Sequence, residues 1–94
     1  MEFEIYDVIR NAVYDITGIS FQEMLNSNKE EAVDARYMFI YLLSTRFTDK
    51  EISIMTGISK SLANKIRNTT YIKNKKYSFK CKMKELEVKL KDYE

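Results

Sequence analysis

The sequence predicts an all-helical domain of five or six helices, and three of its features indicate this class. Proline is absent and only two glycines occur in 94 residues, so few positions would interrupt a helix. Apolar residues recur at steps of three and four along most of the chain, which is the spacing of one helix face. Serine or threonine precedes glutamate by three residues at three places, an arrangement typical of helix starts.

The first helix is expected over residues 3–16. Within this range the apolar residues keep helical spacing, and Gly18 follows where a left-handed C-terminal cap would lie. At the other end of the chain, a final helix is expected from Ser78 onward.

Three capping boxes predict where the helices in between begin. In such a box the hydroxyl accepts a hydrogen bond from a backbone amide, and the glutamate accepts one from the amide of the cap residue. The first box starts a short helix, the second a long helix that continues through Phe47, and the third a helix whose apolar residues point inward. The boxes pair Ser20 with Glu23, Ser27 with Glu30, and Thr48 with Glu51.

The long helix is expected to be the scaffold of one hydrophobic core. Its aromatic residues are interpreted as packing residues, because platforms for stacked bases usually lie on open sheets or in grooves. The core is expected to contain Phe39, Leu42, Leu43, Ile52, Ile58, Leu62 and Ile66.

The C-terminal part of the chain leaves two questions open. Residues 71–78 lack helical spacing, and their apolar and polar residues alternate only weakly. They are therefore expected to form a loop, with a small β-wing as the alternative. Residues 79–94 then form an amphipathic helix beside the main domain of residues 1–78. This helix either folds back onto the first helix, within the same domain, or pairs with a second copy as a homodimer. Its apolar stripe consists of Phe79, Met83, Leu86, Leu90 and Tyr93.

Composition argues against several classes of protein. The chain has one cysteine, Cys81, and no histidine, so we expect no internal disulfide, no metal site and no cofactor. Its carboxylates show no recognisable catalytic spacing, so we do not expect an enzyme. The chain starts with acidic residues, unlike a secretory signal, and its longest apolar run, Tyr37 to Leu43, is far below the roughly 20 residues that cross a bilayer. A cytoplasmic protein without a membrane partner is therefore expected.

Charge is distributed unevenly along the chain. Residues 1–59 carry five basic and ten acidic groups, a formal charge of −5, whereas residues 60–94 carry eleven basic and four acidic groups, a formal charge of +7. This asymmetry suggests that the second half faces a polyanion such as nucleic acid. A lysine-rich helix that is simply solvated is the alternative.

Residues 48–70 (TDKEISIMTGISKSLANKIRNTT) have the pattern of a helix-turn-helix. Gly57 is expected to make a turn that needs positive φ, Ile58 to fill the space between two helices, and Ser59 to cap the second helix. The distance of the glycine from Thr48, and the inward position of Ala63, match the spacing found in bacterial repressors.

The second helix of this motif, near Ser59 to Asn68, is predicted to be a recognition helix for double-stranded DNA. Asparagine can bond adenine through two hydrogen bonds, lysine can reach guanine or phosphate, and serine can bond either a base edge or a phosphate. The predicted function is regulatory, in transcription or replication. The predicted DNA-binding residues are Ser59, Lys60, Ser61, Asn64, Lys65, Arg67, Asn68 and Lys73.

Over residues 5–68 the order of elements resembles the C-terminal DNA-binding domain of the bacterial replication initiator DnaA, which has a Trp-repressor-like helical fold. The stretch IYDVIRNAVYDITGISFQEML is similar to that family's first two helices. Ala35 and Arg36, followed by YMFIYLL, resemble the start of its long helix, and the Glu-Ile-Ser at 51–53 resembles its Glu-Ile-Gly. No glycine-rich phosphate loop is present, so the resemblance implies a DNA-reading module without an ATP-driven motor.

The chain departs from that family at its DNA contacts. The family's arginine-rich loop, which enters a minor groove, corresponds here to Asn28, Lys29, Glu30 and Glu31, and its Asp-His-Thr-Thr signature corresponds to residues 59–62. The usual initiator box is therefore not the expected target. The missing basic loop and the acidic first half also favour a second hypothesis, a protein-interaction module that keeps the helix-turn-helix shape without binding DNA.

Overall fold

The computed structural model describes residues 3–93, with the side chains of residues 4–92. The described part contains six α-helices, one turn of 3₁₀-helix and no β-strand, which confirms the predicted all-helical class. No helix within it combines the length and the apolar character that a membrane crossing needs. The helices are α1 (Phe3–Thr17), α2 (Phe21–Asn26), α3 (Glu30–Ser44), α4 (Asp49–Thr56), α5 (Lys60–Lys73), α6 (Tyr77–Leu90) and η1 (Lys91–Tyr93).

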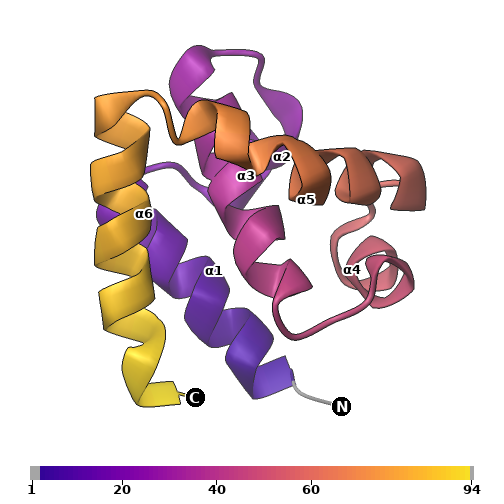
Figure 1. The fold of residues 1–94 in the computed structure, drawn as a ribbon. Coiled ribbons are helices and arrows are strands. Elements are labelled where there is room, and N and C mark those ends of the chain that lie inside the picture. The colour runs from indigo at the N-terminus through magenta and orange to yellow at the C-terminus, as the bar shows by residue number, and fades with distance from the viewer. Residues whose placement is uncertain (1–2, 94) are drawn as a thin grey trace.

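Helix α3 lies in the middle of the domain (Figure 1). Helices α1, α2, α4 and α5 all contact it, and α6 packs against α1. In the view of Figure 1, α5 crosses the upper half of the molecule, whereas the start of α1 and the end of α6 lie at the bottom. As a result, α5 has one side on α3 and the opposite side towards solvent.

A cluster of three aromatic rings joins the first three helices. Phe39 of α3 is fully buried, and the rings of Tyr6 and Phe21 meet it edge to face, with centroid distances of 5.8 Å and 5.9 Å. Such pairs contribute about 1 kcal/mol each beyond the area that they bury. The interpretation of the aromatic residues in the long helix as packing residues is therefore confirmed for Phe39.

The predicted core is correct at six of its seven positions. Leu62 is the exception, because 37% of its surface is exposed. Of the residues expected to face inward from α5, Ala63 and Ile66 are buried, and the third buried position of the helix is Thr70 in place of Leu62. Thr70 was not recognised as part of this face because it is polar, yet it is buried and its hydroxyl donates to the Ile66 carbonyl oxygen at 2.6 Å. The six buried residues are Phe39, Leu42, Leu43, Ile52, Ile58 and Ile66.

The apolar stripe of α6 folds back onto α1, which is one of the two arrangements considered above. Four of its five residues are buried and belong to the same core as the rest of the domain, so they are not free to form a dimer seam. The side chain of Tyr93, the fifth, lies outside the described residues. The four buried residues are Phe79, Met83, Leu86 and Leu90.

Three boundaries differ from the prediction. Helix α3 ends at Ser44, whereas the long helix was expected to continue through Phe47. The loop is shorter than residues 71–78, because α5 continues to Lys73 and α6 begins at Tyr77, and no wing forms between them. The prediction of a capping box between Ser27 and Glu30 is wrong. Helix α3 begins at Glu30 without a side-chain cap, and the Ser27 hydroxyl accepts instead from the amide of Lys29 at 3.1 Å.

A cluster of charged side chains ties the end of α5 to α3. Asp34 is only 8% exposed, and its carboxylate accepts hydrogen bonds from Lys73 Nζ, at 2.9 Å, and from Lys76 Nζ. Lys76 also pairs with Glu30 at 2.8 Å, and hydrogen bonding to the two carboxylates raises the pKa of its ammonium group. Lys73 in addition lies 4.8 Å from the centre of the Tyr37 ring.

Asp34→Ala is expected to lower the free energy of unfolding by about 2 kcal/mol, because it removes charge-assisted hydrogen bonds to two lysines, one of them partly buried. Glu30→Ala is a matched control, since it removes another carboxylate from Lys76. Its side chain is 75% exposed, and its loss should therefore cost less than about 1 kcal/mol. Urea denaturation measures both variants, and equal losses would contradict this account of the cluster.

Candidate nucleic-acid interface

Helices α4 and α5 are joined by three residues, Gly57, Ile58 and Ser59, in the conformation that the sequence predicts. Gly57 has φ of 80°, a left-handed value that strains a residue with a Cβ atom. Ile58 is 9% exposed between the helices, and the Ser59 hydroxyl accepts from the amide of Leu62 at 3.1 Å. At the start of α4, Thr48 and Glu51 form the complete capping box.

The turn is stabilised by its own side chains. The Thr56 hydroxyl donates to the Ile52 carbonyl at 2.7 Å and accepts from the Ile58 amide at 3.1 Å. This closes the end of α4 and directs the chain into α5 with two local hydrogen bonds. The direction of α5 is therefore determined within a few residues of the turn.

One side of α5 is buried and the other carries polar and basic groups. The buried side consists of Ala63, Ile66 and Thr70, which pack towards α3 and α4. Seven of the eight predicted DNA-binding residues are exposed on the remaining surface. These seven are Ser59, Lys60, Ser61, Asn64, Lys65, Arg67 and Asn68.

The eighth predicted residue, Lys73, lies apart from this surface. It is partly buried in the ion-pair cluster with Asp34 and stacks on Tyr37. Its ammonium group is engaged in holding the end of α5 on α3. The sequence offered no indication of this pairing, because Asp34 is 39 residues away.

An acidic residue also reaches the exposed side of α5. Asp49, the first residue of α4, accepts hydrogen bonds from Arg67 Nε at 3.3 Å, from Arg67 Nη2 at 3.0 Å and from Asn64 Nδ2 at 3.1 Å. Asn68 Nδ2 donates in turn to Asn64 Oδ1 at 3.2 Å. Hydrogen bonds from Arg67 and Asn64 lower the pKa of the Asp49 carboxyl group, which is therefore ionised at neutral pH. The spacing of residues in the sequence did not predict this network.

The basic surface extends further than the predicted contacts. Residues 52–84 contain nine basic residues and no acidic one, a pattern that the division of the chain after residue 59 did not bring out. Three of the nine, Arg67, Lys73 and Lys76, are paired with carboxylates. Within the described part of the chain the other six have no ion-pair partner. They are Lys60, Lys65, Lys75, Lys80, Lys82 and Lys84.

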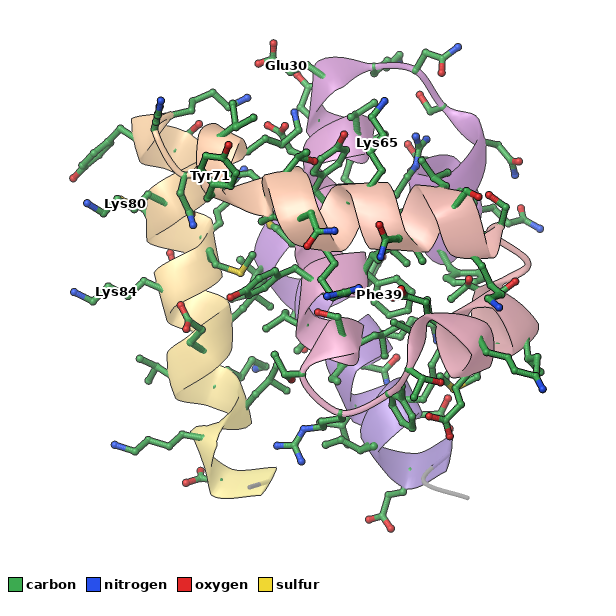
Figure 2. All side chains as sticks on the ribbon, turned by 45° about the vertical axis from the view of Figure 1, so that its right-hand side comes forward. Glu30, Phe39, Lys65, Tyr71, Lys80 and Lys84 are labelled. Atoms are coloured by element: carbon green, nitrogen blue, oxygen red, sulfur yellow. The ribbon has the colours of Figure 1, made fainter. Side chains whose placement is uncertain are left out.

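Exposed aromatic groups lie next to these lysines at the junction of α5 and α6. Tyr71 is 65% exposed and Tyr77 is 80% exposed. Figure 2 shows Tyr71 on α5 near its junction with α6, and Lys80 and Lys84 extending outward from α6. The arrangement offers ammonium groups and aromatic rings to a polyanion beyond the predicted recognition helix.

Comparisons of the chain with protein-family models, with curated proteins and with solved structures give no match. Among the described residues, no three histidine, cysteine, aspartate or glutamate side chains come together in a group that could hold a metal ion. The resemblance to the DnaA C-terminal domain remains a prediction from the sequence.

Proposed function

We propose that the chain binds double-stranded DNA, with α4, the turn and α5 acting as a helix-turn-helix and α5 as the recognition helix. The observation that supports this most strongly is the division of α5 into a buried side and an exposed side that carries no acidic residue of its own. Helix α5 has 14 residues and is therefore about 21 Å long. The major groove of B-DNA is wide enough to admit an α-helix.

The exposed residues are proposed to contact different parts of the duplex, some the bases and others the phosphates. Ser61, Asn64, Lys65 and Asn68 share one face of α5, since they follow at steps of three, one and three residues. Asn64 is the proposed base reader and Lys60 lies beside it, whereas Lys65 and Arg67 are proposed to contact phosphate. The proposed role of the complex is regulation of transcription or replication.

The DnaA initiator box is not the proposed target. The residues that correspond to that family's minor-groove loop are acidic at 30 and 31, and Glu30 is engaged with Lys76 in the ion-pair cluster. Carboxylates at this position would repel the phosphates that arginines attract. The direct contacts to base edges are therefore proposed to come from α5 alone.

Fluorescence anisotropy with a labelled random-sequence duplex tests the proposal. At about 50 mM salt we expect a Kd in the micromolar range, and log K should fall linearly with log salt concentration, with a slope of about −0.9 for each phosphate neutralised. A duplex selected from a randomised pool should bind more tightly than the random duplex. Absence of binding at about 100 μM protein in low salt would refute the proposal, since non-specific affinities are typically tighter than this.

A second candidate function is supported by the exposed apolar side chains near the turn and at the end of α5. Ile54 is 68% exposed and Ile72 is 51% exposed, and Leu62 contributes a further apolar surface. These residues would suit a protein partner, with the helix-turn-helix retained as a scaffold. This candidate predicts that Ile54→Ser weakens the complex with the protein partner, whereas charge substitutions on α5 have little effect on that complex. Any binding to duplex DNA should be unaffected by Ile54→Ser.

A further inference from the structure

Among the carboxylates that the structure describes, Asp49 is the one in hydrogen-bonding contact with the exposed recognition residues of α5. Its side chain is 22% exposed and that of its ion-pair partner Arg67 is 40% exposed, so the network lies at the surface. The contacts span 15 and 18 residues of sequence and join the start of α4 to the middle of α5. An acidic group at this point weakens the attraction for DNA, which calls for a physical reason.

The network determines how the amide group of Asn64 is oriented. An ionised carboxylate only accepts hydrogen bonds, so the NH₂ group of Asn64 must face Asp49, while its oxygen faces the NH₂ group of Asn68. The two ends of an amide group are nearly equivalent in shape. Without these hydrogen-bond partners, the side chain could therefore adopt either orientation. Asp49 removes this ambiguity before any ligand arrives.

The hydrogen-bonding capacity that remains on Asn64 is what an adenine edge requires. One N–H of its NH₂ group and one lone pair of its oxygen are left unused, and adenine presents N7 as an acceptor beside the N6 amine as a donor. Arg67 likewise retains its Nη1 group and one Nη2 hydrogen for a phosphate, since Asp49 occupies only its Nε and one hydrogen of Nη2.

We infer that Asp49 is a specificity-determining residue of the DNA-binding surface, which holds Asn64 in the orientation that reads a base and, by pairing with Arg67, weakens the attraction of that guanidinium group for phosphates in general. The inference rests on the proposed DNA-binding function. It assigns a DNA-reading role to a residue on α4 that makes no base contact itself. It also explains why a carboxylate is tolerated on a basic surface, because the loss of general affinity is accompanied by a gain in discrimination.

The test compares the wild-type chain with Asp49→Asn on two duplexes, one selected by the wild type from a randomised pool and one of random sequence. Asp49→Asn should bind the random duplex more tightly and steepen its salt slope by about one unit, because Arg67 is released to phosphate. The ratio of the two affinities should fall about tenfold, the scale of one base contact. In an Asn64→Ala background the same substitution should leave the ratio unchanged.

Asp15→Asn is the matched control. It makes the same change of charge in another exposed ion pair, with Lys89, on α1 and α6. It should leave the affinity ratio unaltered. Thermal unfolding followed by circular dichroism would verify that both variants are folded.

The outcomes distinguish a failure of the proposed DNA-binding function from a failure of the proposed role of Asp49. If the wild type binds no duplex, the proposed function and this inference both fail. If the wild type prefers its selected duplex but Asp49→Asn changes both affinities by the same factor, only the inference is overturned. A reduced ratio that persists in the Asn64→Ala background would overturn it as well, because the effect would not act through Asn64.

Discussion

Simultaneous replacement of Lys60, Asn64 and Lys65 by alanine is expected to abolish sequence-specific DNA binding. Loss of the Asn64 contact alone should cost about 1 to 3 kcal/mol at one base pair, which is roughly a fivefold to 150-fold loss of affinity. Loss of Lys65, a proposed phosphate contact, should reduce the magnitude of the salt slope by about one unit, because each phosphate contact displaces counterions. All three side chains are exposed, so the fold should be preserved.

A second triple variant, Asn11, Lys89 and Lys91 to alanine, serves as its control. It removes the same types of side chain and the same charge from exposed positions on α1, α6 and η1. The end of α6 lies at the opposite end of the molecule from α5 in Figure 1. Anisotropy titrations should show nearly wild-type binding for this control. If both triple variants bind equally well, or equally badly, α5 is not the recognition surface.

Ile66→Ala is expected to destabilise the domain by about 2 to 5 kcal/mol, the range for a buried aliphatic side chain that leaves a cavity. Ile66 is 0% exposed and lies on the side of α5 that packs towards α3. Such a loss is a large fraction of the stability of a domain of this size, which is about 5 to 15 kcal/mol. Urea unfolding monitored by circular dichroism measures it directly.

Leu62→Ala is the informative comparison, because sequence spacing placed both residues in the core. Since Leu62 is 37% exposed, its truncation removes only part of the transfer free energy and leaves no enclosed cavity. We expect a loss of about 1 kcal/mol. Equal destabilisation by the two variants would show that α5 is rotated about its axis from the orientation described above.

The helix starts were predictable where the interactions that define them are local. The Thr48 box is complete because both of its hydrogen bonds form within four residues. The prediction failed at Ser27, where a distant group takes part. Arg36 of α3 donates to the Ser27 carbonyl oxygen at 2.9 Å and to that of Met24 at 2.7 Å, which holds the connection in an extended form and delays the helix start.

The sequence predicted which side of α5 carries the candidate site, but it did not predict the hydrogen bonds and ion pairs within that site. The helical repeat is sufficient to separate exposed from buried positions on α5, with Leu62 at the boundary. The partners of the charged residues were not predictable, because Asp49 and Asp34 reach α5 from 18 and 39 residues away. Charge pairs between such segments depend on how the helices pack, which sequence spacing alone does not define.

A repeated tetrapeptide shows which features of the fold the local sequence determines. Thr-Gly-Ile-Ser occurs at 17–20 and at 56–59. At both places the threonine hydroxyl donates to the carbonyl oxygen four residues earlier at 2.7 Å and accepts from the isoleucine amide at 3.1 Å. The glycines have φ of 74° and 80°, and the serines cap the following helices. The sequence by itself thus determined two matching turns, because every interaction in them is local.

Only the tertiary structure decided what each turn leads to. After the first turn, α2 ends after six residues, its Met24 is buried, and its end is held by Arg36. After the second, α5 continues for 14 residues with its basic side exposed and its far end held by Asp34. The difference arises because burial, ion pairs and the rotation of a helix about its axis depend on contacts between segments that are distant in the chain.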